Sequence, residues 1–193
     1  MNFIALAKAV RAELGQEQRY AHVVRVARVA GRLAARHGED SGKARTAGML
    51  HDLARLYSAP RLIEECERRG LPITDFERAN PIVLHAPLGA ELARERFGVD
   101  DPDVLAAIRC HTLGAPQMPR LAEIVYVADS VEPGRTFAGR AGLEALAFRS
   151  LDAATIGVIE ASLHYLKATG ATPAPQTLAA LAAYRERSSA CPT

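Results

Sequence analysis

The nine residues Ala47 to Arg55, AGMLHDLAR, decide how the rest of the sequence is interpreted. Small and apolar residues surround the adjacent His51 and Asp52, so the pattern places an imidazole and a carboxylate on the buried face of a predicted helix over about 42–56. An unpaired charge at such a position is costly in free energy. The pair is therefore either satisfied by ordinary hydrogen bonds or neutralised by a bound cation, and the other segments of the chain have to distinguish these alternatives.

Composition restricts the classes of protein to which the chain can belong. Its 193 residues suit one domain, and 24 Lys and Arg against 22 Asp and Glu give a formal charge of only +2, unlike a general nucleic-acid binder. The three cysteines are odd in number and form no CxxC pair, which argues against a disulfide framework and a thiolate zinc site and favours a cytoplasmic location. The N-terminal MNFIALAKAVRAEL has helical spacing and lacks the features of a signal peptide or membrane span. We expect neither a nucleic-acid nor a membrane partner.

Helical periodicity runs from end to end, and no run of residues argues for a strand, so the predicted fold is all-α. In the helix predicted over 19–36, apolar residues share one face, and a stripe of Arg25, Arg28, Arg32 and Arg36 is predicted to be a solvated face. After the helix over 42–56, further helices are predicted over about 58–70, 87–98, from 100–103 onward, 151–169 and 175–187, with a glycine-containing loop before residue 151.

Four of the six histidines share one kind of environment. His22, His51, His85 and His111 each lie within or at the edge of a predicted helix beside small or apolar residues, whereas His37 and His164 are expected to be structural or surface residues. A single buried histidine is more often hydrogen-bonded in the core than bound to metal. Four of them together with Asp52 and Asp129 favour a shared ion, because burying so many titratable groups without one is costly. Imidazole and carboxylate ligands suit iron, manganese, cobalt, nickel or zinc.

The order of His22, then His51-Asp52, then Asp129 on a helical scaffold resembles the HD-domain phosphohydrolases. The segments RYAHVVRVA, KARTAGMLHDLAR, NPIVLHAPLGA, AIRCHTLGAPQM and LAEIVYVADSVEPGR narrow the resemblance to the YqeK-type members, the bacterial symmetrical bis(5'-nucleosyl)-tetraphosphatases. It covers about 19–135, and PAPQTLAALAAYRER near the end is similar more loosely. Leu53 and Arg55 stand where that family commonly has an aromatic residue and a lysine.

This resemblance implies a single HD-domain helical bundle over 1–193, with a motif-bearing core at about 19–135 and C-terminal helices at about 151–187. It implies hydrolysis of diadenosine tetraphosphate and related dinucleoside polyphosphates to two ADP, with iron as the expected metal and one or two ions bound. By position, the metal ligands are His22, His51, Asp52 and Asp129. His85 and His111 match further active-site histidines that either hold a second metal or contact phosphate; together with His51 and Asp52 they form the expected catalytic set.

The expected chemistry is attack of a metal-bound water on an inner phosphorus, with ADP as leaving group. Basic and hydroxyl side chains within or beside the matched segments are the candidates for binding phosphate: Arg19, Lys43, Arg55, Arg109, Thr112 and Arg135. For each arginine a surface salt bridge is an equally good explanation. Gly48 and Gly89 are predicted to allow close packing of helices near the site.

Other functions on the same scaffold stay open, because a fold does not fix a substrate. One class comprises enzymes: a nucleotidase, a deoxynucleoside triphosphohydrolase or a cyclic-nucleotide phosphodiesterase. The other is a nucleotide-binding HD module without turnover. The apolar faces of the terminal helices allow a homodimer, although the same faces would serve equally to close the core.

Overall fold

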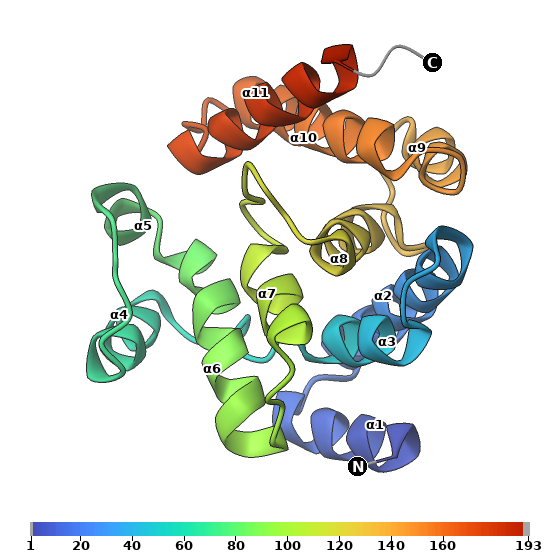
Figure 1. The fold of residues 1–193 in the computed structure, drawn as a ribbon. Helices are drawn as coiled ribbons and strands as arrows, with labels where there is room; N and C mark the ends of the chain where they lie inside the picture. The colour runs from blue at the N-terminus through green and yellow to red at the C-terminus, as the bar shows by residue number, and fades with distance from the viewer. Residues whose placement is uncertain (1, 191–193) are drawn as a thin grey trace.

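The computed structural model describes residues 2–190, and within this range the chain forms eleven α-helices, one 3₁₀ helix and no strand. The all-α prediction is thereby confirmed (Figure 1). The helices are α1 (Phe3–Leu14), α2 (Glu17–His37), α3 (Ser41–Leu50), α4 (Ala59–Arg68), α5 (Asp75–Ala79), η1 (Pro81–Leu84), α6 (His85–Phe97), α7 (Pro102–Cys110), α8 (Arg120–Val131), α9 (Arg140–Ala147), α10 (Leu151–Ala168) and α11 (Pro175–Ala190).

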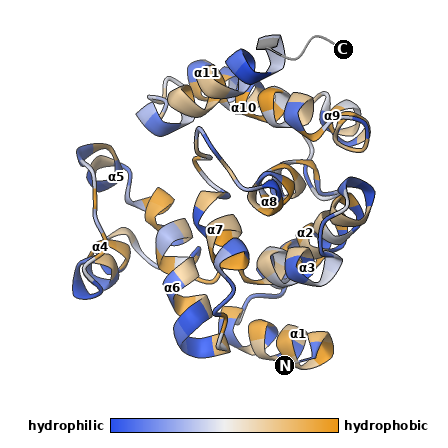
Figure 2. Cartoon of the chain, viewed as in Figure 1, coloured by the Kyte–Doolittle hydropathy of each residue, from blue (hydrophilic) through white to orange (hydrophobic). Residues whose placement is uncertain are grey.

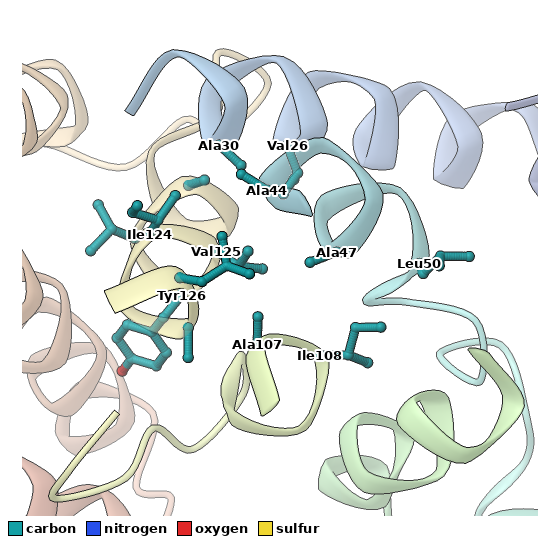
Figure 3. Packing of buried hydrophobic residues seen from close by; sticks show 14 of the residues in the cluster. Val26, Ala30, Ala44, Ala47, Leu50, Ala107, Ile108, Ile124, Val125 and Tyr126 are labelled. Carbon is teal, nitrogen blue, oxygen red and sulfur yellow. The ribbon is translucent and has the colours of Figure 1, made fainter. Parts of the chain in front are cut away.

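The centre of the core lies between α2, α3, α7 and α8 (Figure 3). Small side chains dominate this contact, so the helix backbones approach one another closely and bring the residues at the helix ends together. The side chains that meet there are Val26, Ala30, Ala44, Ala47, Leu50, Ala107, Ile108 and Val125. Hydrophilic residues lie on the outer side of peripheral helices such as α4 (Figure 2). In the described part of the chain, every helix is too short or too polar to span a bilayer.

Glycine permits the closest helix contacts beside the site, as predicted. A Cβ atom on Gly48 would lie 2.8 Å from the Cα of Ala27, so α3 could not approach α2 as it does with any larger residue at that position. A Cβ atom on Gly89 would lie 3.3 Å from the carbonyl oxygen of His51. These two glycines therefore set the separation of α3 from α2 and α6.

The predicted helix over 42–56 is too long, because α3 ends at Leu50 and His51 is its C-cap. Its start is as expected: the Asp40 side chain accepts hydrogen bonds from the N–H groups of Gly42 and Lys43 at 2.7 and 3.0 Å. After Leu50 the backbone tightens into turns with three-residue spacing, including a 3.0 Å bond from Arg55 N–H to the Asp52 carbonyl. The buried pair thus lies at a helix end, where neighbouring side chains are not restricted to helical directions.

The C-terminal helices α9, α10 and α11 pack as a layer on α8 (Figure 1). The loop predicted before residue 151 is partly wrong, because Arg140–Ala147 forms α9 in contact with α10. Gly157 on α10 makes room there for the side chain of Leu143. A buried polar contact joins α11 to α8, since the Tyr184 hydroxyl donates to Glu123 Oε1 at 2.7 Å.

Candidate metal centre

The four histidines singled out in the sequence converge in the structure, and each has at most 6% of its surface exposed. His22 belongs to the first half of α2, while His51 and His111 are the C-caps of α3 and α7. His85 is the first residue of α6. Three of the four therefore lie at helix ends, where a side chain can reach groups that the helix leaves free.

Hydrogen bonds fix the orientation of the three histidines at helix ends. Each Nδ1 lies within hydrogen-bond distance of the backbone carbonyl three residues earlier, at 2.8 Å for His51 and Gly48, 2.5 Å for His85 and Ile82, and 2.7 Å for His111 and Ile108. A carbonyl only accepts hydrogen bonds, so each Nδ1 carries a proton and each neutral ring keeps a lone pair on Nε2. All three rings present this lone pair to the same region.

The first set of donor atoms consists of His22 Nε2, His51 Nε2 and Asp129 Oδ1, which all lie within 4.8 Å of one another. His22 Nε2 is 3.0 Å from Asp129 Oδ1 and 3.6 Å from Asp52 Oδ2, so Asp52 adjoins this set. Within residues 2–190, three buried side-chain polar atoms lack a hydrogen-bond partner, and two of them are His22 Nε2 and His51 Nε2. Buried lone pairs that face one another fit a shared cation, because the ion would satisfy all of them.

Asp52 connects this set to a second one. Its Oδ2 faces His22 and His51, whereas its Oδ1 lies 3.4 Å from His85 Nε2 and 3.9 Å from His111 Nε2. The Nε2 atoms of His85 and His111 are 3.0 Å apart. The single carboxylate therefore stands between two groups of imidazoles.

Titration favours the protonation states that metal ligands need. Burial, together with the neighbouring histidines, lowers the pKa of His85 to about 4 and that of His111 to about 4, so both are neutral at pH 7. Burial by itself would raise the pKa of Asp52, but His51, His111 and His85 outweigh it and the pKa is lowered. Two imidazoles of the cluster are therefore neutral beside an ionised carboxylate, as metal ligands need to be.

His22 lies in the most negative part of the cluster. Burial by itself would lower its pKa, but Asp129, Glu132 and Asp52 outweigh this effect and raise the pKa above its ordinary value. An environment that stabilises a proton on this ring also favours a metal cation beside it, since both are positive charges among carboxylates.

A cavity of about 570 Å³ opens on part of the two donor sets. Three of the predicted phosphate-binding arginines and the predicted threonine line it together with members of both donor sets: Arg19, Arg55, Arg135, Thr112, Asp52, His85, His111 and Asp129. Arg19 Nη1 donates to Asp52 Oδ2 at 2.7 Å, and Arg135 Nη2 donates to Asp129 Oδ1 at 2.5 Å. Positive charge is thus placed directly around the carboxylates.

Two of the residues predicted to bind phosphate, Lys43 and Arg109, do not line this cavity. Lys43 pairs with Asp101 at 2.7 Å, because it lies in the first turn of α3, about 12 Å along the helix axis from His51. Arg109 is two residues from His111, which turns it by about 200° around α7 and directs it to Glu91 on α6 at 3.2 Å. Closeness in sequence to a ligand did not place either side chain on the cavity.

The arginine stripe on α2 is only partly a solvated face. Arg28, Arg32 and Arg36 are exposed as predicted, but Arg25 Nε donates to Glu132 Oε2 at 2.5 Å, so its placement on the solvated face is wrong. Glu132 follows α8 and has 1% of its surface exposed. The sequence does not single out Glu132, because EPGR resembles an ordinary turn and because His22 and Arg25, which Glu132 contacts, are more than 100 positions away along the chain.

Two histidines lie outside the metal centre. His37 Nε2 donates to the Ala147 carbonyl at 2.7 Å, and His164 is exposed, so both have the structural or surface roles expected of them. Side chains of the later segments also line the cavity although nothing in the sequence pattern singled them out as site residues: Ser130, Thr136 and Tyr165.

The helical fold and the histidine and aspartate cluster agree with the comparisons with known proteins. A model of the HD domain family matches residues 19–134, and the chain belongs to this family. Within it, the chain is 39% identical over 150 residues to the symmetrical bis(5'-nucleosyl)-tetraphosphatase of Bacillus subtilis, covering 78% of this chain and 80% of the relative. It is 36% identical over 163 residues to the protein of the same name from Halalkalibacterium halodurans, covering 84% and 87%.

A solved structure shares the whole fold. The crystal structure of a predicted HD superfamily hydrolase involved in NAD metabolism, from Clostridium acetobutylicum, superimposes with a TM-score of 0.92 at 34% sequence identity. The match covers 97% of this chain and 98% of that chain, so it includes the C-terminal helices beyond the family model.

Proposed function

We propose that this chain is a metal-dependent hydrolase that cleaves diadenosine tetraphosphate and related dinucleoside polyphosphates at the central linkage, giving two ADP. The observation that carries the proposal is a cluster of four imidazoles and two carboxylates, of which His85, His111 and both carboxylates line a cavity of about 570 Å³ together with three arginines. The names of the relatives from Bacillus subtilis and Halalkalibacterium halodurans support the choice of substrate.

The residues that would hold the metal follow from the two donor sets. His22, His51, Asp52 and Asp129 would bind one ion, and the second oxygen of Asp52 with His85 and His111 supports a second ion beside it. Nitrogen and oxygen ligands suit iron, which we retain as the proposed metal. A bound ion of this kind supplies a water nucleophile at neutral pH and polarises a phosphoryl oxygen.

Arginine side chains would bind the polyphosphate. A guanidinium has five N–H donors, so Arg19 and Arg135 keep donors for phosphate while they hold Asp52 and Asp129. Both also line a second cavity, of about 230 Å³. A polyphosphate that extends from one cavity to the other passes these two arginines, which suits a cut in the middle of the chain of phosphates. Arg55 and Thr112 complete the phosphate contacts from the larger cavity.

One nucleoside would occupy the outer part of the larger cavity. Phe137 and Tyr165 line it and are 40% and 67% exposed, although large apolar side chains are usually covered. Val158 and Ala161 of α10 add apolar surface to the lining of the same cavity. Exposed aromatic rings beside an apolar wall suit stacking with a nucleobase.

The first test is turnover with product analysis. Purified protein loaded with iron under anaerobic conditions is incubated with diadenosine tetraphosphate, the products are separated by ion exchange, and metal is counted in the same sample. We expect ADP as sole product, loss of turnover on chelation, and loss of both metal and turnover in His51→Ala. Arg28→Ala is the control, because Arg28 is exposed on α2 and should leave metal content and turnover unchanged.

Other products would contradict the proposal. AMP with ATP would indicate an asymmetric cut, release of triphosphate or phosphate from mononucleotides would favour another HD hydrolase, and bound metal without turnover would favour a nucleotide-binding module. We further propose that residues 1–193 act as one domain, because α10 contributes side chains to the cavity formed by the HD core. The homodimer and the cytoplasmic location stay predictions.

A further inference from the structure

His22 differs from the other three histidines of the centre in what holds its Nδ1. It lies within α2, where helix hydrogen bonds engage the nearby backbone carbonyls. His51, His85 and His111 use such carbonyls only because they lie at helix ends. His22 needs an acceptor from another element, and its Nδ1 lies 3.0 Å from Glu132 Oε1.

The last turn of α8 contacts His22 on both ring nitrogens. Asp129 Oδ1 lies 3.0 Å from Nε2, and Glu132, three residues later, binds Nδ1. Glu132 is the C-cap of α8, so the last turn of this helix and its cap together supply both a proposed metal ligand and the acceptor that orients another ligand. The imidazole plane is therefore fixed at both ends by a single element.

Glu132 is itself held in place by Arg25 and Gly134, neither of which is a proposed metal ligand. Arg25 Nε donates to Oε2 at 2.5 Å, Arg25 Nη2 donates to Oε1 at 3.2 Å, and the Gly134 N–H donates to Oε2 at 2.5 Å. A Cβ atom on Gly134 would overlap the Arg25 guanidinium, so a larger residue there would displace the guanidinium from its present position. The carboxylate is thus held by a guanidinium and a backbone N–H in addition to its contact with His22.

We propose that Glu132, held by Arg25 and Gly134, is a positioning residue of the metal centre that keeps the proton of His22 on Nδ1 and directs the Nε2 lone pair to the metal. The inference rests on the proposed metal centre. A carboxylate acceptor also makes the imidazole a stronger ligand than a neutral carbonyl does. His22 is therefore distinguished from the three histidines that are oriented by carbonyl groups.

The test uses zinc alone as probe, because zinc binds the same donor types and is diamagnetic. Metal-free wild type, Glu132→Gln and Glu123→Gln are titrated with Zn²⁺ against a chromophoric chelator. Glu123 is the matched control: it belongs to α8, has 2% of its surface exposed, and binds Arg120, Tyr184 and Arg187 but no histidine. Glutamine at 132 has a single acceptor oxygen for the four N–H groups that contact the Glu132 carboxylate, and its amide N–H₂ would face some of those donors.

We expect Glu132→Gln to weaken zinc binding by about 10- to 100-fold, and Glu123→Gln to leave it unchanged. In the zinc-loaded protein, NMR should show faster exchange of the His22 Nδ1 proton, while those of His51, His85 and His111 are unaffected and serve as internal controls. An affinity loss no larger than that of Glu123→Gln, or an unchanged His22 proton, would overturn the inference. A wild type that binds no zinc or other transition metal would instead overturn the proposed function.

Discussion

Replacement of Gly48 by alanine tests whether the distance between α2 and α3 sets the geometry of the metal centre. Gly48 lies in α3, three residues before His51, and its carbonyl orients His51 Nδ1. An added Cβ would lie 2.8 Å from Ala27 Cα and 3.0 Å from Ala27 N, and both are backbone atoms that no rotamer change can move. The two helices must therefore separate to accommodate the methyl group.

The change in the free energy of unfolding on Gly48→Ala is the sum of two opposing contributions. Alanine is favoured over glycine inside a helix by about 1 kcal/mol. Overpacking a rigid contact costs up to about 3 kcal/mol. We expect Gly48→Ala to lower the free energy of unfolding by about 2 kcal/mol, which for a chain of this length lowers Tm by about 4–8 °C.

Gly142→Ala is the matched control, because Gly142 lies in α9 and a Cβ there would meet no atom within 4 Å. The same substitution should raise stability at this position by about 0.5–1 kcal/mol. Urea and thermal unfolding followed by circular dichroism give both values, and zinc titration shows whether only Gly48→Ala weakens the metal centre. If the two variants are equally stable and bind zinc equally well, close packing at Gly48 does not determine the geometry.

Three further outcomes are expected. Metal at about 100 times its dissociation constant should raise the free energy of unfolding by about 2.7 kcal/mol and Tm by about 5–10 °C, as measured by scanning calorimetry. The same shift of Tm in His51→Ala would contradict the proposed ligands. Tyr165→Ala should raise KM for diadenosine tetraphosphate about 5- to 150-fold with little change in kcat, since stacking contributes about 1–3 kcal/mol per base. Leu178→Ala, at an exposed position of α11, should leave KM unchanged. Burial raises the pKa of the Cys66 thiol to about 11, so iodoacetamide at about pH 8 should modify Cys66 only after unfolding; peptide mapping that finds equal labelling in native protein would refute this.

The sequence was a good guide wherever the relevant interaction is local. Periodic apolar residues and capping residues predicted most helices, because helical hydrogen bonds and caps join residues only a few positions apart. The prediction failed over 42–56, where the chain leaves the helix at His51, and at α9, whose short segment is stabilised by contact with α10.

The sequence by itself determined the all-α fold and the residue types of the proposed metal centre, because buried histidines and aspartates stand out against an apolar background. Only the tertiary structure decided which charged side chains surround it. Lys43 and Arg109 are near the ligands in sequence but point elsewhere, since direction around and distance along a helix decide what a side chain reaches. Conversely, Glu132 meets His22 across 110 positions of sequence, because the packing of α8 against α2 creates that contact and no local pattern encodes it.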